Sequence, residues 1–79
     1  MASMDVMAAV EAVIRDEFPS FKGIVTPETT AMDVDGWDSL AHIGVIMRLE
    51  RVLEVDIDPE SSLSFQNIGE LVSYIDKMI

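Results

Sequence analysis

The chain has 79 residues, of which 49% are hydrophobic, and its fifteen acidic and five basic residues give a formal charge of −10. This length predicts one domain over residues 1–79 with a modest core, too small to hold both a large catalytic cleft and its scaffold. The negative charge disfavours nucleic acid and anionic lipid and favours basic protein surfaces, while the lack of cysteine excludes disulfides and thiolate metal sites.

The first predicted helix runs from about Asp5 to Phe18, because apolar residues recur there at steps of three and four. Ser3 or Asp5 can cap its start, and Pro19 ends it, since the residue before a proline is pushed out of the helical region. Its polar face is expected to lie in solvent. The expected buried residues are Val6, Met7, Val10, Val13, Ile14 and Phe18, and the polar ones are Glu11, Arg15, Asp16 and Glu17.

A connection without sustained periodicity follows from Pro19 to Trp37. Such length in a small domain calls for a reason. The segment Thr26-Pro27-Glu28 predicts a short turn, and Gly36 predicts a backbone turn that directs Trp37 inward and Ser39 outward. The residues expected to attach the loop to the helices are Ile24, Val25, Met32, Val34 and Trp37.

Asp33, Asp35 and Asp38 suggest a calcium loop, and the EF-hand pattern tests this hypothesis. The glycine stands at the fourth position of that frame instead of the sixth, and Gly44 occupies the twelfth, where a bidentate glutamate is required. No ordered metal site is therefore predicted, although loose binding of divalent cations by the carboxylates stays open as an alternative.

Asp38-Ser39-Leu40 opens the second predicted helix, which extends from about Ser39 to Glu54. A helix start has unpaired backbone N–H groups and a positive dipole end, so a phosphate joined to the Ser39 hydroxyl would be stabilised there. The same tripeptide is also typical of an ordinary helix start, with Asp38 as N-cap and Ser39 in the first turn.

Two apolar stripes lie along this second helix. The wider stripe, expected in the core, comprises His42, Val45, Ile46, Leu49 and Leu53. Leu40, Ile43 and Met47 form a second stripe, offset from the first. This stripe predicts an apolar patch beside Ser39, of the kind that marks partner surfaces. The alternative is a helix buried on one wide face.

The end of the chain predicts two more helices. Asp58-Pro59-Glu60 starts a short one that ends near Leu63. Asn67 as N-cap and Glu70 three residues later are typical of a capping box, followed by a last helix that buries Ile68, Leu71, Val72 and Ile75. The fold class is therefore all-α, with three main helices, one short helix and a long first loop.

No catalytic set is predicted. His42, the only histidine, lies one turn after Ser39, but no second donor pair for an oxyanion and no shielded cleft are evident. A zinc site would need three or four converging nitrogen or sulfur ligands. We expect His42 at the mouth of the core beneath Ser39, or bonded to polar groups there.

The segment Gly36-Trp37-Asp38-Ser39-Leu40, the apolar helix after it and the closing run from Ile68 to Ile75 resemble the acyl carrier protein family over essentially the whole chain. The resemblance implies a four-helix acyl-carrier-like bundle without catalytic activity of its own. It also implies a 4′-phosphopantetheine arm, moved from coenzyme A onto Ser39 by a phosphopantetheinyl transferase, with Asp38 and Leu40 beside it. An acyl or aminoacyl group would then be held as a thioester on the arm. The alternative is an unmodified protein-interaction domain with the same fold.

The chain departs from the family in its second helix, which is strongly acidic in carriers of fatty-acid synthesis. Here Arg48 and Arg51 stand in that helix, with Glu50 and Glu54 as its acidic residues. The departure favours a specialised lipid, polyketide or peptide pathway. Expected partners are acyl-activating, acyltransferase or synthase enzymes, met by a cytoplasmic monomer that does not insert into membranes. The expected partner-binding residues are Leu40, Ile43, Met47, Glu50 and Arg51.

Overall fold

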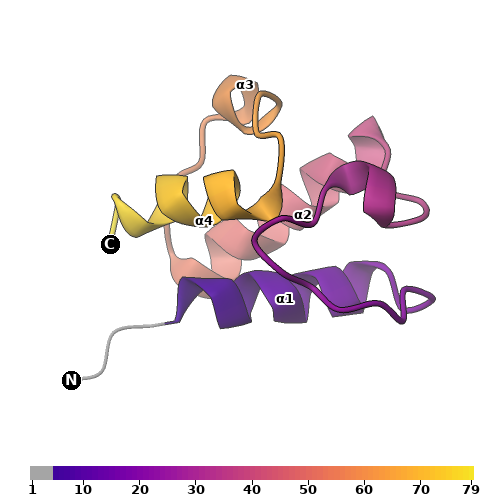
Figure 1. The fold of residues 1–79 in the computed structure, drawn as a ribbon. Helices are drawn as coiled ribbons and strands as arrows, with labels where there is room; N and C mark the ends of the chain where they lie inside the picture. Colours follow the sequence, from indigo (N-terminus) through magenta and orange to yellow (C-terminus); the bar gives the residue numbers. More distant parts are fainter. Residues whose placement is uncertain (1–4) are drawn as a thin grey trace.

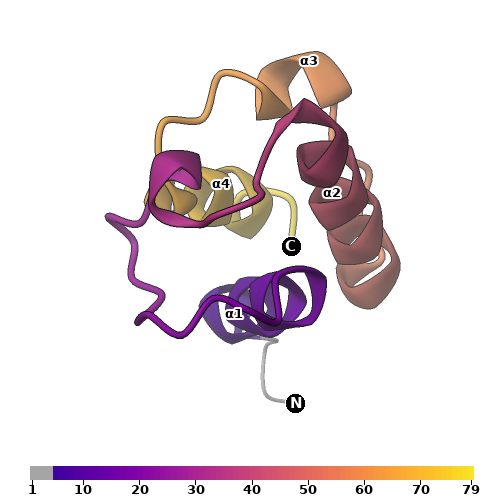
Figure 2. The ribbon, with the colours of Figure 1, turned by 90° about the vertical axis from the view of Figure 1, so that its right-hand side faces the viewer.

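A computed structural model describes residues 5–79, apart from the side chain of Pro59. In chain order it contains α1 (Val6–Glu17), a 3-10 helix (Ala31–Asp33), α2 (Ser39–Leu53), α3 (Pro59–Ser62) and α4 (Ile68–Asp76) (Figure 1). Helix α1 packs against both α2 and α4, and α3 lies against α2. Figure 2 shows the long loop passing on the side of α1 and α4 that is opposite to α2. The predicted all-α fold with three main helices and one short helix is confirmed.

Side-chain caps place the helix starts where the sequence predicts them. The Ala8 N–H donates to Asp5 Oδ1 at 3.3 Å, and the Glu70 N–H donates to Asn67 Oδ1 at 2.9 Å. Ser3 lies outside the described residues. The capping box at α4 is only half formed, because Glu70 Oε1 accepts the N–H of Gln66 at 3.0 Å and not that of the N-cap Asn67. Glu70 therefore still pairs with a second backbone donor, one residue earlier than predicted.

The core lies where the buried faces of α1, α2 and α4 meet. Val10, Ile14, Leu49 and Ile75 are fully buried at its centre. Ile57, from the connection between α2 and α3, joins this core although no helical pattern predicted it. Met7 is only half-buried, and Val72, predicted to be buried, is also half-buried. The remaining predicted core residues of the first helix are buried: Val6, Val13 and Phe18.

Part of the predicted loop attachment is wrong. Val25 and Val34 are buried and Trp37 is half-buried, as predicted. Ile24, however, is 81% exposed and Met32 is 96% exposed. Ile24 lies in irregular chain directly before the buried Val25, and the two neighbouring side chains have opposite surroundings. The presence of an apolar residue in the loop therefore does not predict that its side chain reaches the core.

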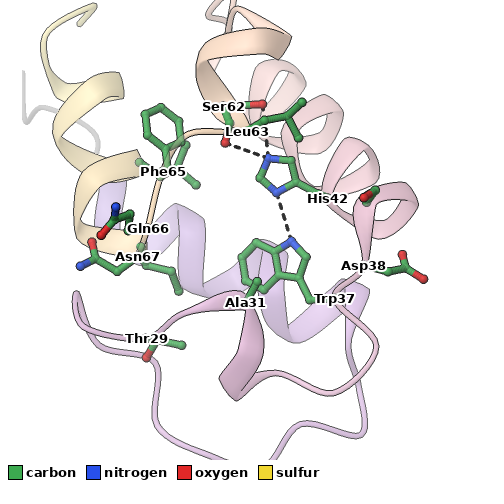
Figure 3. Close-up of a pocket in the computed structure, with 13 residues that line it drawn as sticks. Thr29, Ala31, Trp37, Asp38, His42, Ser62, Leu63, Phe65, Gln66 and Asn67 are labelled. Carbon is green, nitrogen blue, oxygen red and sulfur yellow. Dashed lines mark hydrogen bonds between the residues drawn. The ribbon is translucent and has the colours of Figure 1, made fainter.

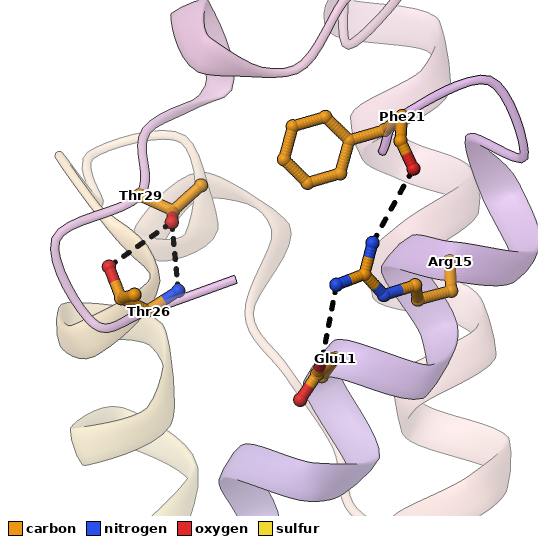
Figure 4. A network of polar contacts seen from close by, with 5 residues as sticks. All are labelled: Glu11, Arg15, Phe21, Thr26 and Thr29. Atoms are coloured by element: carbon orange, nitrogen blue, oxygen red, sulfur yellow. Dashed lines mark hydrogen bonds and ion pairs between the residues drawn. The ribbon is translucent and has the colours of Figure 1, made fainter. Parts of the chain in front are cut away.

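The predicted turn is present and is closed by the threonine on its far side. The Thr29 N–H donates to the Thr26 carbonyl at 3.0 Å. The Thr26 N–H donates to Thr29 Oγ1 at 2.9 Å (Figure 4). The turn also meets α4, because the Ile68 N–H donates to the Thr29 carbonyl at 2.9 Å. The loop thus pairs with a backbone donor that every helix start leaves without an intrahelical partner.

The polar face of α1 is not simply solvated. Arg15 pairs with Glu11 and donates to the Phe21 carbonyl at 3.4 Å (Figure 4). The bond to Phe21 holds the start of the loop against the helix. Asp16 and Glu17 both pair with Arg48 of α2. The expected solvated face is confirmed for Arg15 and Asp16, which are exposed, whereas Glu11 and Glu17 are partly buried.

Candidate functional site

Ser39 occupies the first position of α2 and is exposed. Before it, the Asp38 carboxylate accepts the Ala41 N–H at 2.9 Å, and the Asp38 carbonyl accepts the His42 N–H at 2.9 Å. The backbone donors of Ser39 and Leu40 belong to the first turn, which has no earlier helical carbonyl to bond. The positive end of α2 therefore lies at the Ser39 hydroxyl, where an attached phosphate would be stabilised.

The backbone turn at Gly36 presents Ser39 to solvent. Gly36 has φ +90°, a conformation that glycine adopts without the steric cost of a Cβ. After it, the half-buried Trp37 stacks on Phe18 with ring centroids 5.4 Å apart, whereas Asp38 and Ser39 are exposed. The predicted arrangement, with Trp37 inward and Ser39 outward, is confirmed.

His42 joins two polar groups beneath Ser39. The Trp37 Nε1–H donates to His42 Nδ1 at 3.1 Å, and His42 Nε2 lies 3.1 Å from the Ser62 carbonyl oxygen (Figure 3). Because an indole nitrogen only donates, Nδ1 must accept, and the ring proton is on Nε2, which donates to Ser62. Of the two places predicted for His42, the structure supports the bonded one.

Burial favours the neutral form of the His42 ring. It lowers the pKa of His42 from the ordinary value of 6.5, and this effect exceeds the opposing one of the hydrogen bond to the Ser62 carbonyl. With Trp37 on one ring nitrogen and Ser62 on the other, both nitrogens are occupied. In this arrangement the ring does not act as a base on Ser39.

A pocket of about 300 Å³ opens beside Ser39, between the first turn of α2, the 3-10 helix, α3 and the start of α4 (Figure 3). Trp37, Leu63 and Phe65 supply much of its apolar wall, whereas Gln66 and Asn67 supply amide groups. Its full lining is Thr29, Ala31, Trp37, Asp38, Ser39, His42, Ser62, Leu63, Phe65, Gln66, Asn67, Ile68 and Leu71.

Sequence reasoning missed most of this pocket. Residues 62–67 come from α3 and its connection to α4, more than twenty positions after Ser39, and they carry no motif of their own. Phe65 was the one available signal, since an aromatic residue in a short polar connection suggests a packed position. Phe65 is indeed half-buried and lies against Tyr74, with ring centroids 5.2 Å apart.

The offset stripe of α2 is exposed on the surface of the protein. Leu40 is 79% exposed, Ile43 52% and Met47 58%, so the alternative of a wide buried face is wrong. These three side chains extend from Ser39 along one side of the helix. Their role in binding partners stays a prediction.

The charged residues near this stripe differ in their contacts. Glu50 is half-buried, and its carboxylate accepts the Ile57 N–H at 2.8 Å. Arg48 pairs with Asp16 at 2.9 Å and also with Glu17. Arg51 is exposed in the last turn of α2. Of the charged residues predicted to bind partners, Glu50 already has an internal role and Arg51 presents its charge outward.

Two absences bear on the site. Within residues 5–79, no group of three or more histidine, aspartate or glutamate side chains is placed to hold a metal ion. Over the same range, no helix combines the length and apolarity needed to cross a bilayer. Asp33, one of the three aspartates considered for calcium, instead accepts the Thr30 N–H at 2.9 Å.

Comparisons with known proteins agree on one family. A family profile described as "Phosphopantetheine attachment site" matches residues 8–75. An acyl carrier protein of Clostridium perfringens (strain SM101 / Type A) is 35% identical over 66 residues, which cover 84% of this chain and 87% of that protein. An acyl carrier protein of Syntrophobacter fumaroxidans (strain DSM 10017 / MPOB) is 31% identical over 77 residues, covering 94% of this chain and 95% of that protein. No solved structure gives a significant match.

The arrangement described above fits a phosphopantetheine group. An exposed hydroxyl stands at the positive end of a helix, where a phosphodiester is favoured, and a pocket opens beside it. The family profile covers this helix start, the pocket wall and most of the core. The chain belongs to the acyl carrier protein family, and 4′-phosphopantetheine is its cofactor.

Proposed function

We propose that the protein carries an acyl or aminoacyl group on a 4′-phosphopantetheine arm attached to Ser39 and delivers it to partner enzymes. The observation that carries this proposal is the position of Ser39, exposed in the first turn of α2 and at the edge of the pocket. When attached, the arm supplies a terminal thiol that holds the cargo as a thioester. The chain itself has no cysteine, so that thiol would have no competitor within the protein.

Asp38 and the first turn of α2 prepare the attachment point. The Asp38 carboxylate is occupied by the Ala41 N–H, which holds the helix start in one conformation. The phosphate of the arm would lie near the remaining donors of the turn, where helix polarity favours negative charge. These residues bind and orient the arm, and the transfer onto Ser39 falls to a phosphopantetheinyl transferase.

The surface around Ser39 supports docking of enzymes. Leu40, Ile43 and Met47 form an exposed apolar stripe that starts beside Ser39, where an enzyme must approach to reach the arm. The formal charge of −10 favours enzymes with basic surfaces, whereas Arg51 adds an exposed cation to this side. We propose that this combination serves acyl-activating, acyltransferase or synthase enzymes of a specialised lipid, polyketide or peptide pathway.

Mass spectrometry tests the attachment directly. The wild type, Ser39→Ala and the control Ser64→Ala would each be incubated with coenzyme A and a transferase of broad specificity. Ser64 is also exposed, but it lies in the turn after α3. We expect the wild type and Ser64→Ala to gain the mass of one phosphopantetheine, and Ser39→Ala to gain none while keeping its helical circular dichroism.

Other outcomes have clear meanings. A gain that persists in Ser39→Ala would move the site to another hydroxyl. If the wild type gains no mass with any transferase, the proposal fails and the alternative of an unmodified interaction domain stands. The exposed stripe of Leu40, Ile43 and Met47 would serve such a domain without an arm.

A further inference from the structure

We propose that His42 is a positioning residue for Ser39 and its pocket. It would act through a bridge of two hydrogen bonds, from Trp37 to His42 and from His42 to Ser62, that is complete only while the imidazole is neutral. We call this the Trp37–His42–Ser62 bridge. The part of the proposal that concerns Ser39 rests on the proposed function, because it assumes that Ser39 is modified.

Two residues of the bridge flank Ser39 in the sequence. Trp37 stands two residues before Ser39 and His42 three residues after it, and their side chains meet at 3.1 Å (Figure 3). Trp37 also stacks on the buried Phe18, so its ring is anchored to the core. The hydrogen bond therefore ties the exposed turn that bears Ser39 to a fixed point in the protein interior.

The other end of the bridge holds a wall of the pocket. Helix α3 has only four residues, and its last one, Ser62, is buried at 3% exposure. His42 Nε2 reaches the Ser62 carbonyl at 3.1 Å and its hydroxyl at 3.3 Å. A second tether of this region lies at its start, where the Asp58 N–H donates to the Tyr74 hydroxyl at 3.3 Å. His42 thus links α2 to the end of α3 that lines the pocket.

Protonation would break the bridge at one defined bond. A second ring proton goes to Nδ1, which then faces the Trp37 N–H, another donor. The Nε2–H bond to Ser62 can persist, so the Trp37 end is the one released. Because burial disfavours the charged ring, the change is expected below the ordinary histidine pKa of 6.5.

The charged residues on the segments next to the ring are carboxylates of its own helix start, of the preceding loop and of α3. Asp38 is the N-cap, and its carboxylate is bonded to a backbone N–H and points away from the ring in Figure 3. Asp35 on the loop is exposed, as are Asp58 and Glu60 on α3, and Asp58 caps its own helix. Among the described residues, none of these carboxylates forms an ion pair with His42. The ring therefore titrates under the control of burial and the Ser62 carbonyl.

The fluorescence of Trp37 tests the bridge in the protein without phosphopantetheine on Ser39. Trp37 is the only tryptophan, and a protonated imidazole quenches indole emission at contact distance. We expect the wild-type emission to change with a midpoint below pH 6.5. His42→Gln should show no such transition, because an amide does not titrate there. The absence of a transition in the wild type, or the same transition in His42→Gln, would overturn the bridge.

The rate of phosphopantetheine transfer tests positioning. His42→Leu removes both hydrogen bonds, whereas His42→Gln keeps one donor and one acceptor. We expect His42→Leu to lower the rate by roughly two- to tenfold, the effect of losing an ordinary hydrogen bond, and His42→Gln to restore most of it. Dividing the wild-type rate by the His42→Gln rate at each pH cancels the pH dependence of the transferase. That ratio should decrease at pH values below the pKa of His42.

The controls separate the possible failures. If His42→Leu is unfolded by circular dichroism, Trp37→Phe replaces it, since phenylalanine keeps the stacking on Phe18 and lacks the donor. A wild-type rate in the folded variant, or a ratio that does not change with pH, would overturn positioning by His42. If no variant is modified at all, the proposed function fails instead, while the fluorescence titration still decides whether the bridge exists.

Discussion

The two apolar stripes of α2 have similar side chains and opposite surroundings. Val45, Ile46 and Leu49 are buried against α1 and the rest of the core, whereas Ile43 and Met47 are more than half exposed. The first stripe therefore contributes to stability through area removed from water, whereas the second leaves its apolar area exposed, and we propose that it contacts another molecule. On this proposal, one helix separates folding from docking by the direction in which its side chains point.

The largest expected effect tests this separation by truncating one residue on each stripe. Leu49 is fully buried, so Leu49→Ala should lower the free energy of unfolding by about 2–5 kcal/mol through lost burial and a cavity. Ile43→Ala should lower it by less than about 1 kcal/mol, because Ile43 is already 52% exposed. Urea unfolding measures both. Comparable losses would place Ile43 in the core and remove the distinction.

The next effect concerns the turn before α2, which directs Trp37 inward and Ser39 outward. Gly36→Ala should lower the free energy of unfolding by about 1–2 kcal/mol, because a residue with a Cβ is strained at φ +90°. The strain is conformational, since the nearest atom to the added Cβ would be Phe18 Cδ1 at 3.9 Å. Thermal unfolding provides the measurement, with the wild type as the comparison. An unchanged midpoint for Gly36→Ala would show that the turn relaxes.

Docking should respond to the exposed stripe more than to the charge beside it. Loss of an apolar anchor at an interface commonly costs more than about 1 kcal/mol, whereas an exposed rim charge costs less. Ile43→Ala and Met47→Ala should therefore lower kcat/KM for transfer to the cognate enzyme by about fivefold or more, and Arg51→Ala by less. Steady-state kinetics with the modified carrier measures this. A larger loss for Arg51→Ala would make docking electrostatic.

The smallest effect concerns the ion pairs between α1 and α2. Arg48 pairs with Asp16 and Glu17, but the Arg48 side chain is 47% exposed and that of Asp16 71% exposed. Arg48→Gln should therefore cost at most about 1 kcal/mol, and added salt should reduce the difference from the wild type. Chemical unfolding at low and high salt gives both numbers. A difference that does not change with salt would mean that packing of the arginine stem, and not its charge, is responsible.

Local features of the sequence determined the helices and the position of Ser39. Asp5, Asp38, Asp58 and Asn67 act as caps through atoms two or three residues away, so their effect depends on short stretches of chain. The direction of Trp37 also follows from an adjacent residue, since Gly36 sets the turn before it. Periodicity predicted the buried stripes for the same reason, because helical spacing repeats within a few residues.

The tertiary structure decided which groups from distant segments meet. Ser62 reaches His42 across twenty positions, and Arg48 reaches Asp16 across thirty-two, so no local pattern predicts either contact. Ile24 and Met32 looked like anchors but are exposed, because inward positions in the loop depend on where the loop crosses the core. The pocket beside Ser39 exists for the same reason: its walls come from helices that approach one another only when the core between them packs.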